Sequence, residues 1–282
     1  MNTQESIQTI RNLRPGWPGR LLHRLLPLRR KVVEENIDIV FGDSLTADEK
    51  KRLAQGFYEH ILKIVAEGLA MSFMSDEAVR RQSRVVGREI LLEAARGGKG
   101  ILFLTGHIGN FELCPVAAIL NFPEYKGRFH FVRRNIGNKF IEKLLFSRFY
   151  RVGLGVIPKR GSVNTILDAL ARNDAITFIM DQYARPGREG IEVEFFGRKA
   201  GTFKSLAILA RASGAPVLPA ICHRGPDGRH VMEFREPLPW VADPDPDREI
   251  YLNTLGYNRV LESIVLEFPD QWWWFHRRWK TK

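Results

Sequence analysis

The stretch ILFLTGHIGNFE, Ile101–Glu112, decides the fold of this chain. Its first four residues are apolar, which is typical of a strand that is buried on both faces of a parallel sheet. Gly106 and Gly109 then mark a tight turn, and we expect a helix from about Phe111. A buried strand that passes through a turn into a helix is the repeating unit of an α/β protein.

The same alternation continues towards the C-terminus. Further short apolar runs lie at Arg128–Arg134, Ala175–Met180 and Ala215–His223, and helical patterns lie near Lys139–Tyr150 and Phe203–Ser213. Runs of this length alternating with helices favour strands of a parallel sheet. We therefore predict an α/β fold, with a mixed, largely parallel central sheet flanked by helices.

The residues before this core have a helical pattern. Thr46 and Glu49 have the spacing of a capping box, and apolar residues then recur at helical intervals as far as Val65. This predicts one long amphipathic helix within Ser44–Met74. We expect a basic N-terminal arm and amphipathic helices over residues 1–75, and an α/β domain over residues 76–282.

Composition narrows the classes of protein. The chain has 282 residues, of which 44% are hydrophobic, so it can bury a sizeable core and is not disordered. The formal net charge is +11, which predicts an acidic partner: nucleic acid, anionic lipid or an acidic carrier protein. The two cysteines, Cys114 and Cys222, fit buried reduced thiols better than a disulfide framework.

A basic segment near the N-terminus suggests contact with a membrane surface. Arg11–Lys31 holds seven Arg and Lys, no acidic residue, and Trp17 among several leucines. Such a segment can lie in the headgroup plane of a bilayer, although a solvated arm or a helix packed on the domain is the alternative. Because no window reaches the roughly 18 to 20 apolar residues of a spanning helix, we expect a chain that is soluble or lies on a surface.

The turn after the first strand of the core carries the candidate chemistry. In α/β sheets, functional groups gather beyond the carboxyl ends of the strands. His107 lies in this turn, and Glu112 follows five residues later, so the two meet only if the glutamate lies in the helix and the histidine precedes it. An imidazole beside a carboxylate makes a hydroxyl nucleophilic. The alternative is a hydrogen-bonded turn histidine and a glutamate at a helix N-terminus.

GHIGNFE, Gly106–Glu112, is similar to the H-x4-D/E motif of glycerolipid acyltransferases, and most resembles that of the bacterial lipid A biosynthesis acyltransferases, the lauroyl and myristoyl transferases. The similarity extends from about Arg30 over nearly the whole chain. Further segments resemble the family in the same order: FVRRN, SRFYRVG, IMDQ, VEFFGRKAGT, LARASGAPVLP and QWWWFHRRWK.

This resemblance implies a glycerol-3-phosphate acyltransferase-like fold and a transferase activity. The reaction moves a fatty acyl chain from an acyl carrier protein thioester to a hydroxyl of a phosphorylated lipid A precursor, without metal or cofactor. His107 would remove the hydroxyl proton, and Glu112 would orient the ring. The residues themselves do not distinguish the carrier protein from a coenzyme A donor.

The resemblance also implies substrate-binding residues. Arg133 and Arg148 would hold phosphate oxygens, because guanidinium groups match phosphate with paired donors. Asp181 would bind a substrate amide or hydroxyl, or anchor an arginine. Gly109 and Asn110 are also expected to bind substrate. The alternatives are a solvated basic face for the arginines and an ordinary turn residue for the aspartate.

The family's enzymes generally begin with a membrane-spanning helix, and this chain departs from that pattern. We therefore expect a peripheral enzyme at the cytoplasmic face of the inner membrane, with acyl carrier protein, a phosphorylated glycolipid and an anionic membrane surface as partners and no nucleic acid. The C-terminal cluster QWWWFHRRWK, with Trp272, Arg277 and Arg278, suits a headgroup boundary or RNA stacking, although some of its rings belong to the core. His276 is interpreted as structural.

Two other functions remain open at this point. One keeps the chemistry but changes the acceptor to a lysophospholipid or a glycophospholipid. The other is a non-catalytic protein that binds membrane or nucleic acid, for which the basic charge and the tryptophans would be sufficient.

Overall fold

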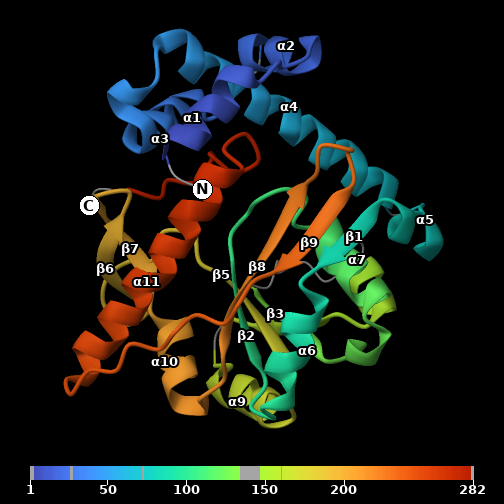
Figure 1. Cartoon of the computed structure of the whole chain (residues 1–282), viewed down its shortest axis with the longest axis vertical. Coiled ribbons are helices and arrows are strands. Elements are labelled where there is room, and N and C mark those ends of the chain that lie inside the picture. Colours follow the sequence, from blue (N-terminus) through green and yellow to red (C-terminus); the bar gives the residue numbers. More distant parts are fainter. Residues whose placement is uncertain (1–2, 26–27, 72, 134–146, 160, 281–282) are drawn as a thin grey trace.

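The computed structural model describes residues 3–25, 28–71, 73–133, 147–159 and 161–280 (Figure 1). Within them a seven-stranded sheet has the order β1-β9-β8-β2-β5-β3-β4. The strands are β1 (Ser83–Val86), β2 (Ile101–Thr105), β3 (Phe129–Arg133), β4 (Gly155–Pro158), β5 (Ala175–Ile179), β8 (Val217–Arg224) and β9 (His230–Phe234). All neighbours pair in parallel except β8 and β9, which confirms the mixed, largely parallel sheet.

The central strand β2 is buried on both faces, as its continuous apolar sequence predicts. Leu102 and Leu104 face an apolar cluster with helices α9 (Val163–Ala171), α10 (Ser205–Ser213) and α11 (Pro246–Glu267). Ile101 and Phe103 face a second cluster with α6 (Arg88–Arg96) and α7 (Leu113–Asn121). An antiparallel hairpin of β6 (Gly190–Phe195) and β7 (Arg198–Phe203) packs against α11.

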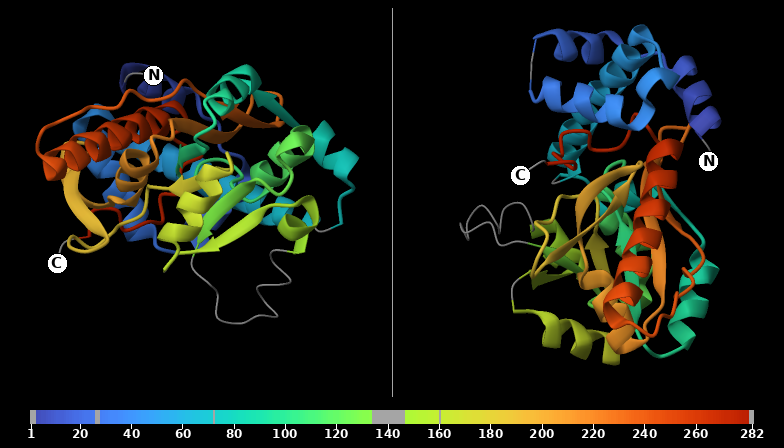
Figure 2. Two further views of the ribbon diagram at one scale, coloured as in Figure 1. Left: turned by 90° about the horizontal axis from the view of Figure 1, so that it is seen from below. Right: turned by 90° about the vertical axis from the view of Figure 1, so that its left-hand side faces the viewer.

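Four helices form a layer beyond one end of the sheet (Figures 1 and 2). They are α1 (Thr3–Asn12), α2 (Trp17–Leu25), α3 (Arg30–Phe41) and α4 (Ala47–Met71), and the short α5 (Asp76–Arg81) follows. The expected capping box starts α4, because the Thr46 N–H donates to Glu49 Oε2 (2.8 Å) and the Glu49 N–H to Thr46 Oγ1 (3.3 Å). These helices share an apolar cluster with the C-terminal residues, so a boundary near residue 75 stays a prediction.

Two stretches differ from their sequence pattern or lie partly outside the described residues. The proline- and aspartate-rich sequence of residues 241–249 predicts a surface connection, but α11 begins at Pro246. The Asp245 side chain accepts from the Asp247 N–H, and proline in the first turn and an aspartate cap are helix-start signals. The helix expected near residues 139–150 lies mostly outside the described residues. The described part of this stretch is helical over residues 147–152. In the described part of the chain, no helix combines the length and apolarity needed to cross a bilayer.

Candidate active site

His107 and Asp181 meet because β2 and β5 pair in parallel. Their register places Thr105 opposite Ile179, so the residues two positions beyond each strand leave the sheet side by side. The His107 backbone N–H donates to Asp181 Oδ2 (2.7 Å), and His107 Nδ1 lies 2.8 Å from Asp181 Oδ1. One buried carboxylate therefore holds both the backbone and the ring of the histidine.

The turn around His107 is shaped by its neighbours. Gly109 has φ 58°, and a Cβ there would lie 2.4 Å from the Cys222 carbonyl oxygen, so only glycine fits. The buried Asn110 accepts hydrogen bonds from the Leu113 N–H (2.9 Å) and the Glu112 N–H (3.3 Å), which starts α7. Gly109 and Asn110, expected to bind substrate, thus lie within the turn and determine its shape.

Glu67 on α4 connects the N-terminal helices to this turn. Its carboxylate accepts hydrogen bonds from Asn110 Nδ2 (2.8 Å) and from Arg224 Nη2 (2.7 Å), and it lies 3.2 Å from His230 Nε2. Burial alone would raise the pKa of Glu67, but the hydrogen bonds of His230 and Asn110 lower the pKa to about 2. Burial likewise opposes the charge on His230, yet the neighbouring Cys114 and Glu67 raise its pKa to about 9.

The environment of Asp181 keeps it ionised. Burial alone would raise its pKa, but the charge and hydrogen bonds of His107 outweigh burial and hold the pKa well below the usual range. Trp272 Nε1 also donates to Asp181 Oδ2 (3.0 Å). An ionised carboxylate only accepts hydrogen bonds, so Nδ1 of His107 carries the proton and Nε2 is the basic nitrogen.

The C-terminal segment supplies a second histidine. His276 Nε2 lies 3.1 Å from His107 Nδ1, and the two ring centroids are 4.7 Å apart. Burial lowers the pKa of His276 to about 4, with Asp181 opposing that shift and the charge of His107 adding to it. Sequence reasoning interpreted His276 as structural, because nothing in the sequence connects residues 169 positions apart.

His107, Asp181 and His276 also have the residue types of a metal site, with one candidate ligand atom of each within 4.8 Å of the others. Hydrogen bonds already join these atoms, and the second oxygen of Asp181 accepts from Trp272 and from the His107 backbone. We therefore interpret the trio as a hydrogen-bonded group and assign no metal to it.

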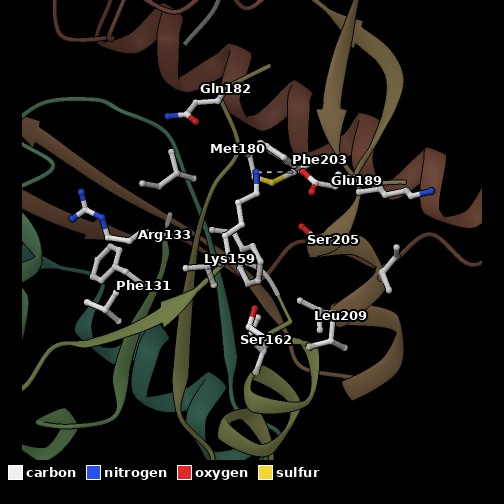
Figure 3. Close-up of a pocket in the computed structure, with 18 of the residues that line it drawn as sticks. Phe131, Arg133, Lys159, Ser162, Met180, Gln182, Glu189, Phe203, Ser205 and Leu209 are labelled. Atoms are coloured by element: carbon white, nitrogen blue, oxygen red, sulfur yellow. Dashed lines mark ion pairs between the residues drawn. The ribbon is translucent and has the colours of Figure 1, made fainter. Parts of the chain in front are cut away.

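A cavity has His107 and Glu112 among its lining residues. Its volume of about 970 Å³ is at the upper end of the range for small-ligand sites. It lies between β3, β4, β5, the end of β7, α9 and α10, and most of its wall is apolar, including Phe131, Val156, Ile166, Phe178, Phe203 and Leu209. Its cations are Arg133, Lys159, Arg188 and Lys204. Figure 3 shows Arg133 and Lys159 among these apolar side chains, with Lys159 paired to Glu189 (3.6 Å).

Glu112 lies on the same cavity wall as His107. The ring nitrogen Nδ1 of His107 is hydrogen-bonded to Asp181 and not to Glu112. It immediately precedes α7, and burial raises its pKa while the charges of Arg133 and His107 oppose the shift. The structure thus brings the two expected catalytic residues to one cavity, and it places the carboxylate of Asp181, two residues beyond β5, against the ring nitrogen of His107.

The two arginines expected to bind phosphate lie in different places. Arg133 ends β3 on the cavity wall. Arg148 is buried and its guanidinium lies 2.6 Å from Asp76 Oδ1 of α5, outside the cavity lining. Two lysines lie in or next to β7: Lys204 lines the cavity, and Lys199 pairs with Glu192 across the hairpin (3.4 Å).

Sequence reasoning missed Glu67, Trp272 and His276. Each reaches the site from an element far from it in the chain, and no local spacing marks them. For Asp181 the sequence did contain a signal. Asp181 follows a buried strand, and the carboxyl end of that strand lies at the same sheet edge as the carboxyl end of β2.

These features define an α/β protein with a histidine on the wall of a largely apolar cavity beyond the carboxyl ends of its parallel strands. The chain matches the bacterial lipid A biosynthesis acyltransferase family over residues 13–281 and belongs to that family. The protein is therefore an acyltransferase of lipid A biosynthesis, and the non-catalytic alternative is wrong.

Relatives in two organisms support this membership. The chain is 25% identical over 265 residues to the lipid A biosynthesis lauroyltransferase of Escherichia coli strain K12, covering 94% of this chain and 83% of the relative. It is 24% identical over 266 residues, with the same coverage, to the lipid A biosynthesis palmitoleoyltransferase of that strain and to a lipid A biosynthesis acyltransferase of Shigella flexneri.

Proposed function

We propose that this protein transfers a fatty acyl chain from an acyl carrier protein thioester to a hydroxyl of a phosphorylated lipid A precursor. The observation that carries the proposal is the pairing of His107 with buried Asp181 on the wall of a largely apolar cavity. A base at this position can act on a hydroxyl while the apolar wall receives the acyl chain.

In the proposed reaction, His107 Nε2 takes the proton of the acceptor hydroxyl as its oxygen attacks the thioester carbonyl. The tetrahedral intermediate then collapses, the carbon–sulfur bond breaks, and the departing thiolate takes the proton back from the imidazolium. The products are an ester and a thiol. Asp181 holds Nδ1–H throughout, which stabilises the imidazolium.

Glu112 acts on the substrate side in this proposal. It lies on the same cavity wall as His107, and burial raises its pKa against the opposing charges of Arg133 and His107. From this position its carboxyl group would hydrogen-bond a polar group of the acceptor or the donor beside the base. This role replaces orientation of the ring, because Asp181 already performs that function.

The cations of the cavity would hold phosphate. Arg133, Arg188 and Lys204 line the same cavity as the base, so a phosphate of the acceptor or of the donor's phosphopantetheine can lie near the reacting groups. Arg148 is directed to Asp76 and has no part in this contact.

A comparison of acceptors tests the proposal. Purified protein with an acyl carrier protein thioester should acylate a phosphorylated lipid A precursor, and His107→Ala should lose about 10²-fold or more of the rate through loss of the general base. Acylation of lysophosphatidate or a glycophospholipid, with no transfer to the lipid A precursor, would instead establish the alternative acceptor. Full activity of His107→Ala would refute the mechanism.

The acidic donor is supported by charge. The chain carries a formal net charge of +11, and cations line the cavity. Attraction between exposed charges is screened beyond about 10 Å at 0.1 M salt, so KM for the carrier-protein thioester should rise between low and physiological salt. A KM that is the same with acyl carrier protein and acyl coenzyme A, and indifferent to salt, would count against the carrier protein.

We also propose that the enzyme acts peripherally, on the anionic cytoplasmic face of the inner membrane. Leu62, Val65 and Leu69 are exposed at helical spacing and form an apolar stripe along α4, and Phe73, beyond the end of the helix, is 91% exposed. Helix α2 packs against α4 and exposes Trp17 and Leu25 beside Arg20 and Arg24. Exposed apolar side chains next to cations suit an anionic bilayer surface.

A further inference from the structure

The C-terminal residues pair with the backbone of the turn that carries His107. The Gly109 N–H donates to the Gln271 carbonyl (3.0 Å), the Trp273 N–H donates to the His107 carbonyl (2.9 Å), and Ile108 and Trp272 form an antiparallel bridge. The segment 271–273 thus lies beside the turn like a short strand, and the chain that follows brings His276 to the histidine ring.

The placement of His276 is fixed from a third direction. Asn36 Nδ2 of α3 donates to the carbonyls of Trp274 and His276, both at 2.8 Å. Arg29 donates to the Phe275 carbonyl (3.0 Å). The N-terminal helices therefore hold the backbone on both sides of the second histidine, which restricts where its ring can lie.

The hydrogen-bond donors and acceptors around His107 Nδ1 allow one arrangement. Asp181 Oδ1 at 2.8 Å can only accept, so the proton is on Nδ1. His276 Nε2 lies 3.1 Å from the same atom and must then present its lone pair, because a proton on His276 Nε2 would point at the proton on His107 Nδ1. The result is a three-centre hydrogen bond with two acceptors for one proton.

We propose that His276 is a positioning residue of the acyl transfer reaction: its Nε2 lone pair is the second acceptor for Nδ1–H of His107. The inference rests on the proposed function of His107 as the base. The second acceptor keeps the proton on Nδ1 and the lone pair on Nε2, where a substrate hydroxyl needs it. It also stabilises the imidazolium that forms when that hydroxyl is deprotonated.

The charges around His276 agree with a neutral acceptor. Asp181 and His107 face it from the ends of β5 and β2, Arg29 from the start of α3, and Arg278 from its own segment. Burial, His107 and the two arginines together lower the pKa of His276 to about 4, against the opposing carboxylate. At the pH of an ordinary assay His276 is therefore uncharged and keeps a lone pair.

Two substitutions separate this role from packing. His276→Leu fills much of the space without an acceptor, and His276→Gln places a carbonyl oxygen near the position of Nε2. We expect His276→Leu to lower kcat by about tenfold to a hundredfold with little change in KM, the effect of one hydrogen bond to a charged group. The acid limb of its pH–rate profile should move to lower pH, and His276→Gln should restore most of kcat.

A matched control is His23→Leu, the same substitution in a half-buried histidine of α2, for which we expect unchanged kcat. If His276→Leu and His276→Gln lose kcat equally, with equal losses of thermal stability and no shift of the pH–rate profile, His276 only packs. If His107→Ala is inactive while His276→Leu keeps full kcat, the positioning role alone is refuted. If His107→Ala is active, the proposed function itself fails.

A spectroscopic readout tests the same geometry without any substrate. NMR of the full chain with ¹⁵N-labelled histidine reports which ring nitrogen carries each proton. We expect the proton on Nδ1 in both His107 and His276 at neutral pH. A proton on Nε2 of His276 would overturn the inference, because that nitrogen would then donate rather than accept.

Discussion

Two basic, tryptophan-containing segments of this chain have similar compositions and different positions in the fold. In Arg11–Lys31 the indole of Trp17 is 70% exposed, whereas Trp272 and Trp274 near the C-terminus are fully buried. Arg278 is also fully buried, and it donates to the Gly201 carbonyl (2.6 Å) and to Thr202 Oγ1 (2.7 Å) of the β6–β7 hairpin.

The difference lies in what each segment packs against. The C-terminal residues meet the hairpin, the turn of His107 and the N-terminal helices. The indole N–H groups of Trp272, Trp274 and Trp279 donate to Asp181 and to the carbonyls of Pro269 and Phe195. Buried indoles cannot stack on nucleotides or lie among lipid headgroups. The expectation that some rings of this cluster belong to the core is confirmed for Trp272 and Trp274, and composition alone does not separate a surface segment from one that builds a site.

The largest effect that this comparison predicts concerns Asp181, which joins the C-terminal Trp272 to His107. Asp181→Asn replaces an obligate acceptor by an amide and permits the wrong tautomer of His107. We expect kcat to fall by roughly 10³- to 10⁴-fold, the scale seen when the carboxylate of a catalytic triad is neutralised. Steady-state kinetics on protein with a native circular dichroism spectrum measures it, and a loss below tenfold would contradict the assigned role.

The next effect contrasts the two kinds of tryptophan directly. Trp274 is fully buried and its Nε1 donates to the Pro269 carbonyl (2.7 Å), so Trp274→Ala should lower the free energy of unfolding by about 3 to 5 kcal/mol. Trp17→Ala removes an exposed ring and should change it by no more than about 0.5 kcal/mol. Urea unfolding of both variants compares them, and equal losses would remove the distinction between the segments.

A smaller effect concerns the surface of the N-terminal helices. Val65→Glu places a charge in the exposed stripe of α4, and it should weaken binding to anionic vesicles by roughly 10- to 100-fold, because burial of one apolar side chain stabilises binding by about 1.5 to 3 kcal/mol. Val241→Glu, the same change at a similarly exposed valine after β9, is the control. Sedimentation with vesicles measures both, and equal weakening by the two variants would mean that net charge alone controls binding.

The smallest effect is a pH dependence where α4 meets the site turn. Because the pKa of Glu67 is about 2 in the folded protein, below its ordinary 4.5, Glu67 stabilises the fold above pH 4.5 and loses this contribution as pH falls towards 2. His230, with its pKa raised to about 9, contributes below pH 6.5 and loses its contribution as pH rises towards 9.

Glu67→Gln should therefore flatten the acid side of the stability curve, measured by urea unfolding between pH 3 and 6. Asp38→Asn, which changes an exposed carboxylate of α3, is the control and should leave that slope unchanged. If Glu67→Gln keeps the wild-type slope, the carboxylate at the junction of α4 and the turn does not control acid stability.

Much of the fold was predictable, because its signals are local. The strand at Ile101–Thr105 has the expected bounds, and the capping box of Thr46 and Glu49 starts α4 as its spacing indicates. The position of His107 beyond a parallel strand followed from the same pattern, and the structure places it on the cavity wall.

The partners of His107 were not predictable from local spacing. The family resemblance implied that Glu112 orients the ring, yet Asp181 lies against the ring nitrogen because β5 is the neighbour of β2 in the sheet. Strand order depends on which faces bury most apolar surface over the whole chain, and no short pattern encodes it. His276 is a still clearer example, since three separate contacts bring it to the site.

The sequence by itself determined the class of fold, the strand–turn–helix unit with His107 in its turn, and membership of an acyltransferase family, because periodicity, turn chemistry and ordered motifs are properties of neighbouring residues. The tertiary structure alone decided which carboxylate and which second histidine meet the base, and which tryptophans remain exposed. Those outcomes depend on distant segments that become neighbours only when the sheet and helices pack.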